Sequence, residues 1–317
     1  MERRRIGGSP LSVLIDGPQD GPLVLCLHGF PDIPLGWAPV MTRLAAAGYR
    51  VVAPWMRGYA PSPIEGPYDV ASLGADVLRI ADALSPAAPV RVLGHDWGAM
   101  VVYPLLAARP DRFASAVTLA VPHPFAIERN ILRHPSQFRR SGYIGFFQLR
   151  GLADAAASRD DFALVEGLWR RWSPDFDPGE GYWSELRRCF EVSAPAPLRY
   201  YRALWHPRSL AYLRRVLSSN ARKLAVPTMY LHGARDGCMS ADMARGQEAY
   251  FGAGFEQVTL EGTGHFAQIE RPDEVTEHAL RWFEPARTPL VGAARPRPAR
   301  AGAFGRCPGA AESGSTR

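Results

Sequence analysis

Apolar residues along the first third of the chain follow two alternating patterns. Short apolar runs, typical of buried strands, alternate with longer stretches in which apolar residues recur at helical spacing. The predicted strands cover residues 11–15, 23–27, 49–54, 89–93 and 116–121. The predicted helices cover residues 37–47, 69–84 and 98–108, and Pro104 should bend the last of them. Strands that alternate with helices predict an α/β fold, a mostly parallel sheet with helices on both faces.

The alternation stops between residues 123 and 221. This stretch has helix-like segments and almost no strand pattern, and it holds four of the eight Trp and five of the eleven Tyr. The alternation then resumes, with strands at 228–232 and 257–260 and helices at 241–251 and 273–283. The pattern predicts two parts of one α/β core, 1–122 and 222–285, separated by a helical cap at 123–221. Residues 286–317 lack periodicity and are predicted to be disordered.

Composition narrows the class of protein. Of the 317 residues, 47% are hydrophobic, which suffices for a large core, and no apolar run approaches the ~20 residues that span a bilayer. The net charge of +6 comes from Arg at the two ends, so we expect no basic face for nucleic acid. The four Cys show neither CxxC nor zinc-site spacing. We therefore expect free thiols, a cytoplasmic location, no metal and no membrane segment.

The segment VRVLGHDWGA, residues 90–99, carries the strongest chemical signal. A strand enters G-x-D-x-G and a helix follows, which is the pattern of a nucleophile elbow with Asp96 at its apex. Gly94 and Gly98 provide the small residues that such a sharp turn needs. The helix dipole favours an ionised carboxylate at this position. The alternative is that Asp96 only caps the helix.

Two further polar residues follow the last two predicted strands. Asp236 lies in LHGARDG and His265 in EGTGHF. The order Asp96, Asp236, His265 is the order of an α/β-hydrolase triad, in which the acid orients the His and the His activates water. Alternatively, Asp236 starts a turn and His265 caps a helix. The segment LCLHGFPD adds a loop after a strand, so the amides of Phe30 and Trp97 are candidates for an oxyanion hole.

These motifs, HGFPD, GHDWGA and GTGHF, together with the placement of the cap, resemble the α/β-hydrolase-fold epoxide hydrolases over about residues 21–283. The resemblance implies that Tyr143 in YIGFFQ and Tyr201 in LRYYR bind the epoxide oxygen. The chain departs from the family in PWMRGYAPS, where Trp55 and Ala60 replace an Asp and a Gly. We assign Arg57 in that segment a structural role, either in an ion pair or as an anchor of the loop.

The function that the resemblance implies is hydrolysis of a small apolar epoxide by water, without a cofactor. Asp96 would form an ester with the substrate, and His265 would activate water to cleave it. A haloalkane dehalogenase is the main alternative, although its halide-binding Asn is replaced here by Phe30. A fluoroacetate dehalogenase would carry Arg where this chain has Trp97. An esterase is disfavoured because no GxSxG occurs, and a non-catalytic binding protein is the remaining alternative.

Overall fold

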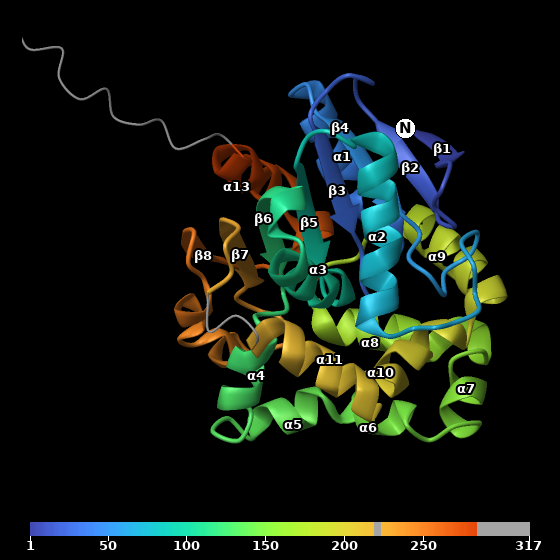
Figure 1. The fold of residues 1–317 in the computed structure, drawn as a ribbon. Helices are drawn as coiled ribbons and strands as arrows, with labels where there is room; N and C mark the ends of the chain where they lie inside the picture. The colour runs from blue at the N-terminus through green and yellow to red at the C-terminus, as the bar shows by residue number, and fades with distance from the viewer. Residues whose placement is uncertain (219–222, 284–317) are drawn as a thin grey trace, which may run out of the picture. The chain divides into compact units, whose positions relative to one another are not determined.

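Eight strands form a single sheet in the computed structural model of the chain, which describes residues 1–218 and 223–283 (Figure 1). The strands are β1 (Glu2–Arg5), β2 (Ser12–Asp16), β3 (Leu23–Leu27), β4 (Arg50–Pro54), β5 (Val90–His95), β6 (Phe113–Leu119), β7 (Thr228–Gly233) and β8 (Phe255–Leu260). Their order across the sheet is β1-β2-β4-β3-β5-β6-β7-β8. The pairs β1–β2 and β2–β4 are antiparallel, and all later neighbours are parallel. The predicted, mostly parallel sheet is confirmed.

Burial decreases from the centre of the sheet toward its edges. Every residue of β3 and β7 is buried, whereas β1 is exposed along its whole length. In β8 only Leu260 is buried. A central parallel strand is covered on both faces, which explains the continuous apolar runs of the inner strands. The edge strand β1 carries charged side chains, which discourage pairing with other chains.

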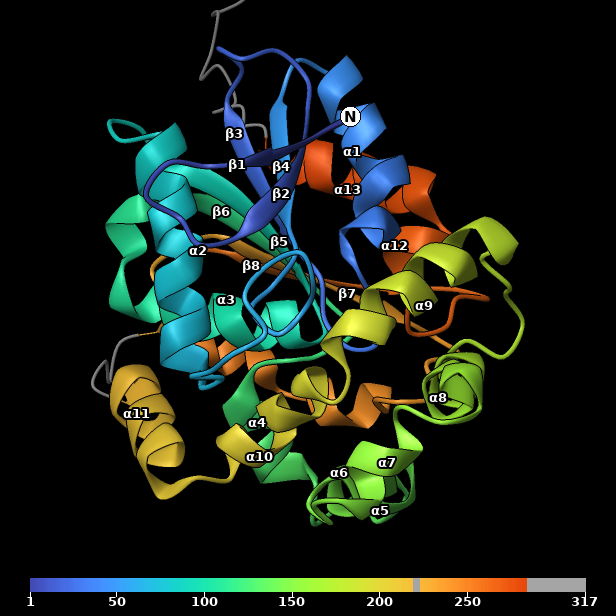
Figure 2. The ribbon, with the colours of Figure 1, turned by 90° about the vertical axis from the view of Figure 1, so that its right-hand side faces the viewer.

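Helices cover both faces of the sheet. Those of the α/β part are α1 (Ala38–Ala46), α2 (Val70–Leu84), α3 (Trp97–Ala108), α12 (Ala267–Glu270) and α13 (Pro272–Phe283). Helix α1 packs against α13, and α2 packs against α3. Figure 2 shows the sheet between these two pairs. Helix α2 begins after Asp69, whose carboxylate accepts the N–H of Ser72 at 3.0 Å, and α3 continues through Pro104 to Ala108.

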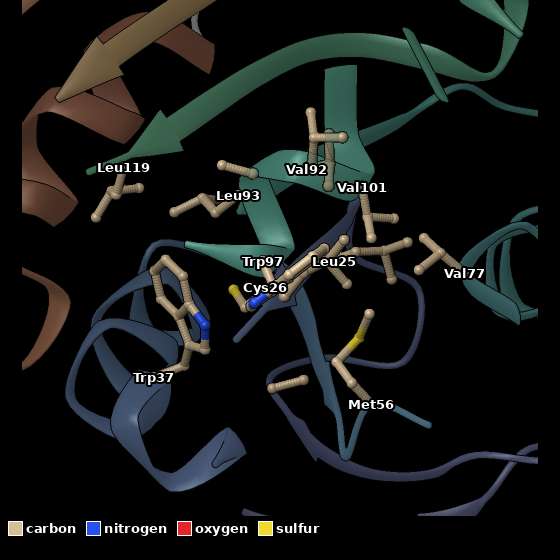
Figure 3. Packing of buried hydrophobic residues seen from close by; sticks show 14 of the residues in the cluster. Leu25, Cys26, Trp37, Met56, Val77, Val92, Leu93, Trp97, Val101 and Leu119 are labelled. Atoms are coloured by element: carbon tan, nitrogen blue, oxygen red, sulfur yellow. The ribbon is translucent and has the colours of Figure 1, made fainter. Parts of the chain in front are cut away.

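The core lies on both sides of the central strands (Figure 3). Successive residues of a strand point to opposite faces. On β5, Val92 therefore packs toward Val101 of α3 and Val77 of α2, while Leu93 points to the other side with Trp37. All five side chains are fully buried. This packing holds the carboxyl end of β5, where the chemical motif begins, in a fixed position.

Between β6 and β7 the chain is helical. The helices are α4 (Pro124–Asn130), α5 (Ser136–Arg140), α6 (Gly142–Phe147), α7 (Leu152–Ala156), α8 (Ala163–Trp172), α9 (Glu180–Ser193), α10 (Arg199–Leu204) and α11 (Pro207–Ser218). Residues 120–218 contribute no strand. In both ribbon views these helices gather at one end of the sheet (Figures 1 and 2). Across the described ranges, no helix is long and apolar enough to cross a membrane.

One predicted element is wrong. The single helix expected at 241–251 is replaced by two short 3₁₀ helices, Ala241–Ala244 and Gln247–Tyr250. The break falls at Gly246, whose φ of 70° lies in the left-handed region and ends any helical run. The predicted disordered segment, 286–317, lies outside the described residues.

Candidate active site

Asp96 lies at the turn between β5 and α3 in a strained backbone conformation, with φ 51° and ψ −114°. A Cβ on Gly98 would lie 2.2 Å from the carbonyl oxygen of Leu27, so only glycine allows the helix to approach β3 this closely. Asp96 occupies the N-cap position of α3, but its side chain makes no capping hydrogen bond. The alternative of a simple helix cap is therefore wrong, and the carboxylate is directed elsewhere. Strain of this kind is characteristic of functional turns.

The two oxygens of the Asp96 carboxylate have different surroundings. Oδ1 accepts the backbone N–H of Phe30 at 2.8 Å, and Oδ2 lies 3.7 Å from Nε2 of His265. A Cβ on Gly29 would lie 2.4 Å from Oδ1 and 2.7 Å from the Trp97 amide nitrogen. The amides of Phe30 and Trp97 therefore flank the same small space. Asp96 is 5% exposed, so this carboxylate is almost removed from water.

Asp236 and His265 form a buried pair. Nδ1 of His265 lies 2.8 Å from Oδ2 of Asp236. The other oxygen of Asp236 accepts the backbone N–H groups of Cys238 at 2.7 Å and Met239 at 2.8 Å. Burial opposes the ionised form of Asp236, but the charge and hydrogen bond of His265 outweigh it and lower the pKa of the carboxyl group. Asp236 thus both forms the turn and orients the imidazole.

The imidazole of His265 is surrounded by negative charge. Burial alone would lower its pKa, but the charge and hydrogen bond of Asp236, together with Asp96, raise the pKa of His265 to about 10. Its Nε2 is buried and makes no hydrogen bond. His265 therefore holds a proton beside Asp96 as long as both carboxylates are ionised.

Two residues of the helical insertion fix the loops that carry this pair, and the sequence patterns did not identify them. The carbonyl of Trp172 accepts the N–H of His265 at 3.1 Å and of Gly237 at 3.0 Å. The hydroxyl of Ser173 accepts the N–H of His265 at 2.9 Å and donates to Glu270 at 2.5 Å. The acid loop and the His loop are therefore joined through the end of α8.

Tyr143 on α6 and Tyr201 on α10 meet near Asp96, with ring centroids 5.5 Å apart. The Tyr201 ring is 5.0 Å from the Trp97 ring and 5.5 Å from the Phe30 ring. The Tyr201 hydroxyl is buried and makes no hydrogen bond. Burial raises the pKa of both phenols well above the ordinary range, and Asp96 adds to the effect. Both groups are therefore protonated donors with few competing partners.

Aromatic side chains enclose this group of residues. Phe30 packs edge-on against Phe147, and Trp172 lies beside both Tyr143 and His265. Within residues 1–218 and 223–283, no cluster of His, Cys, Asp or Glu has the arrangement of a metal site. The surroundings of Asp96 are therefore apolar apart from the carboxylates, the imidazole and the phenols.

His95 and Arg57 make structural contacts. His95 is the last residue of β5, and its Nε2 lies 3.0 Å from the carbonyl oxygen of His265, so it supports the His loop. Arg57 makes two hydrogen bonds of 2.8 Å to the buried carboxylate of Asp76, as expected for a structural ion pair.

Asp32 is buried and accepts hydrogen bonds from Tyr182 at 2.7 Å and Gln268 at 3.0 Å. Burial raises the pKa of Asp32 to about 7.

Comparison with known proteins gives consistent matches. The model of the alpha/beta hydrolase fold family matches residues 22–272. An epoxide hydrolase of Caballeronia sordidicola is 31% identical over 83% of this chain and 88% of its own length. The AB hydrolase superfamily protein YfhM of Bacillus subtilis (strain 168) is 28% identical over 87% of this chain and 95% of its own. The epoxide hydrolase of Bacillus megaterium, solved with an inhibitor, has a TM-score of 0.77 and 23% identity, covering 89% of this chain and 99% of its own.

Proposed function

The chain belongs to the α/β-hydrolase-fold epoxide hydrolase family, and from that premise we propose that it opens an epoxide to a vicinal diol through a covalent ester on Asp96. One observation carries the proposal. The Asp96 carboxylate lies 3.7 Å from Nε2 of His265, and the rings of Tyr143 and Tyr201 meet beside Trp97, the residue after Asp96. A carboxylate nucleophile, a water-activating base and donors for a leaving oxygen are the three groups that this reaction needs.

In the first step, Oδ2 of Asp96 attacks a carbon of the epoxide ring. The bond between that carbon and the ring oxygen breaks, and the oxygen takes a proton from Tyr143 or Tyr201. The products of the step are a hydroxyalkyl ester on Asp96 and a tyrosinate, which regains through water the proton that His265 releases before the second step. The protonated phenols are required because an alkoxide is a poor leaving group.

In the second step, His265 takes a proton from water, and the resulting hydroxide attacks the carbonyl carbon of the Asp96 ester. Oδ1 becomes the oxyanion. The amides of Phe30 and Trp97 are suited to stabilise it because Phe30 N–H is already bonded to that oxygen at 2.8 Å. Collapse of the intermediate breaks the ester bond to the substrate oxygen, which takes the proton from His265 and leaves as the diol. The Asp96 carboxylic acid that remains gives its proton to His265, which restores the starting state.

The charge of Asp96 sets the order of the two reaction steps. While Asp96 is ionised, it contributes to the high pKa of His265, so the imidazole is protonated and cannot act as a base. Formation of the ester neutralises Asp96 and removes that contribution. His265 can then lose its proton and activate water only after the first step is complete.

We assign residues 123–221 the role of a cap that supplies both phenols and encloses an apolar epoxide. The aromatic rings around Asp96 favour a substrate with a small apolar substituent. We also propose a reducing, cytoplasmic setting, because the three described cysteines, Cys26, Cys189 and Cys238, are buried and unpaired. Cell fractionation tests that location.

A single turnover with excess enzyme in ¹⁸O-labelled water tests the covalent route. The diol from the first turnover should be unlabelled, and the label should appear in the peptide that contains Asp96. The His265→Gln variant should accumulate the ester, detected as a mass increase on the same peptide, and Asp96→Ala should abolish both the adduct and the activity. Prompt label in the first diol without an adduct would falsify the covalent route.

A panel of epoxides and halogenated alkanes distinguishes epoxide hydrolysis from its main alternative, haloalkane dehalogenation. Epoxide hydrolysis should produce diol from the first class of substrate with little halide from the second. Halide release that exceeds diol formation would favour a haloalkane dehalogenase. Absence of turnover with both classes would favour a binding protein.

A further inference from the structure

The hydroxyl of Tyr143 has one side-chain contact that the proposed reaction does not use. It lies 3.6 Å from the sulfur of Cys238, which is 2% exposed. The hydroxyl of Tyr201, whose ring lies 5.5 Å from that of Tyr143, has no hydrogen-bond partner. The two phenols are therefore unequal before substrate arrives, because one is held and the other is free.

The position of the Cys238 sulfur is fixed by hydrogen bonds of its own backbone. Its N–H donates to Asp236 at 2.7 Å, and its carbonyl accepts from Gln137 of α5 at 2.9 Å. The side-chain oxygen of Gln137 also accepts the N–H of Ser240 at 2.9 Å, so Gln137 binds the loop at both Cys238 and Ser240. The thiol is thus held at a set place between the triad acid and the helical cap.

We propose that Cys238 is a positioning residue that serves as the resting hydrogen-bond partner of Tyr143, and that the weakness of this bond lets the phenol transfer readily to the epoxide oxygen. The inference rests on the proposed function. Sulfur is a weak hydrogen-bond acceptor, so little is lost when the phenol turns to the substrate. Burial raises the pKa of Cys238 well above the ordinary range, so the group is a neutral thiol and not a strongly accepting thiolate.

Two substitutions separate this role from simple packing. Cys238→Ser replaces sulfur by oxygen in nearly the same volume and gives Tyr143 a stronger partner. Cys238→Ala removes the partner and leaves a small cavity. If weakness of the bond matters, ester formation should be slowest in the Ser variant, and the Ala variant should equal or exceed the parent chain. If Cys238 only fills space, the order is reversed, because the Ser variant preserves packing and the Ala variant does not.

The measurement is the second-order rate constant for ester formation, followed by stopped-flow fluorescence of the Trp residues beside the site with an aryl epoxide. We expect a loss of about two- to tenfold in Cys238→Ser, the range that one neutral hydrogen bond provides. The rate of ester hydrolysis should be unchanged in both variants, which controls for damage to the Asp236 loop. In a Tyr143→Phe background the difference between Ser and Ala should disappear.

A spectroscopic readout tests the contact without turnover. The S–H stretching band of a cysteine responds to its hydrogen bonds and lies in a window free of other protein absorption. The infrared difference between the parent chain and Tyr143→Phe should show a shifted S–H band, and the same difference in a Cys238→Ser background should not. An Ala variant slower than the Ser variant, or an unshifted band, overturns the role of Cys238. Failure of the parent chain to form an ester with any epoxide overturns the proposed function instead, whatever the band shows.

Discussion

Replacing Asp96 by Asn should change the protonation of His265 by a predictable amount. Nε2 of His265 lies 3.7 Å from Oδ2 of Asp96. At an effective dielectric constant of about 20, two unit charges at this separation attract by about 4–5 kcal/mol. Since a pH unit corresponds to about 1.4 kcal/mol, removal of the Asp96 charge should lower the midpoint of the His265 titration by about three pH units. The pKa of His265 in the intact site is about 10.

The Asp96→Asn variant imitates the neutral ester, so its His265 should titrate near neutral pH. The assay is the pH dependence of the imidazole ring signals in NMR spectra of the parent chain and the variant. The corresponding kinetic expectation is that ester hydrolysis increases with pH through a midpoint near neutrality, as expected for a base that must lose its proton. Ester formation should show no such midpoint between about pH 6 and 9, because it needs His265 only as a charged neighbour.

The same shift predicts a change in stability with pH. A raised pKa in the folded state stabilises the protein fully below the ordinary His value of 6.5, and the contribution is lost as pH rises through about 10. The contribution of His265 to the free energy of unfolding should therefore decline between pH 7 and 10 in the parent chain. In Asp96→Asn the decline should be smaller and should be complete at lower pH.

A matched control removes a carboxylate near a different His. Asp242 lies 3.4 Å from Nδ1 of His134, and Asp242→Asn should leave the His265 midpoint unchanged. If Asp96→Asn also leaves that midpoint within half a pH unit of the parent value, the charge of Asp96 does not control His265. The proposed timing of the two steps would then be wrong, even if the ester itself forms.

Other substitutions test the donors, the elbow and the buried ion pair. Tyr143→Phe and Tyr201→Phe should each slow ester formation by about 10²–10⁴-fold in stopped-flow experiments, the usual contribution of a general acid, and parent-like rates would remove the phenols from the mechanism. Gly98→Ala should lower the free energy of unfolding, measured by urea denaturation, by about 1–3 kcal/mol or more, because its Cβ would lie 2.2 Å from a carbonyl oxygen. Gly142→Ala should leave it unchanged, because open space surrounds that position. Asp76→Asn should cost about 3–5 kcal/mol in the same assay because it leaves a partly buried guanidinium without its partner, and a loss below 1 kcal/mol would contradict this assignment.

The sequence was informative where one local pattern has one structural outcome. The run that became β3 is continuous and apolar because both faces of this strand are covered. The glycines around Asp96 identified the sharp turn because no other residue fits there. The proposed triad residues followed from a further rule, that the carboxyl ends of parallel strands meet at one edge of the sheet.

The elements that the sequence missed depend on contacts between distant residues. Strand β1, residues 2–5, consists of one Glu and three Arg, all exposed, and its extended form comes from pairing with β2. No hydrophobic alternation marks such a strand. The helix expected at 241–251 failed for the opposite reason, because the apolar spacing was present but Gly246 adopts a left-handed conformation that the spacing does not reveal. Gln137 bonds to backbone atoms about a hundred residues away, and no pattern around it indicates this.

The geometry of the proposed triad also depends on the helical insertion, so both the α/β core and the insertion form the site. The acid loop after β7 and the His loop after β8 each direct one N–H to the carbonyl of Trp172, at 3.0 Å from Gly237 and 3.1 Å from His265. Because a buried N–H without an acceptor is costly, these loops are stable in this arrangement only while the end of α8 is in place. The insertion therefore does more than cover a finished site. It brings the phenols to Asp96 and, through one backbone carbonyl, holds the acid and the base at the separation that their hydrogen bond requires.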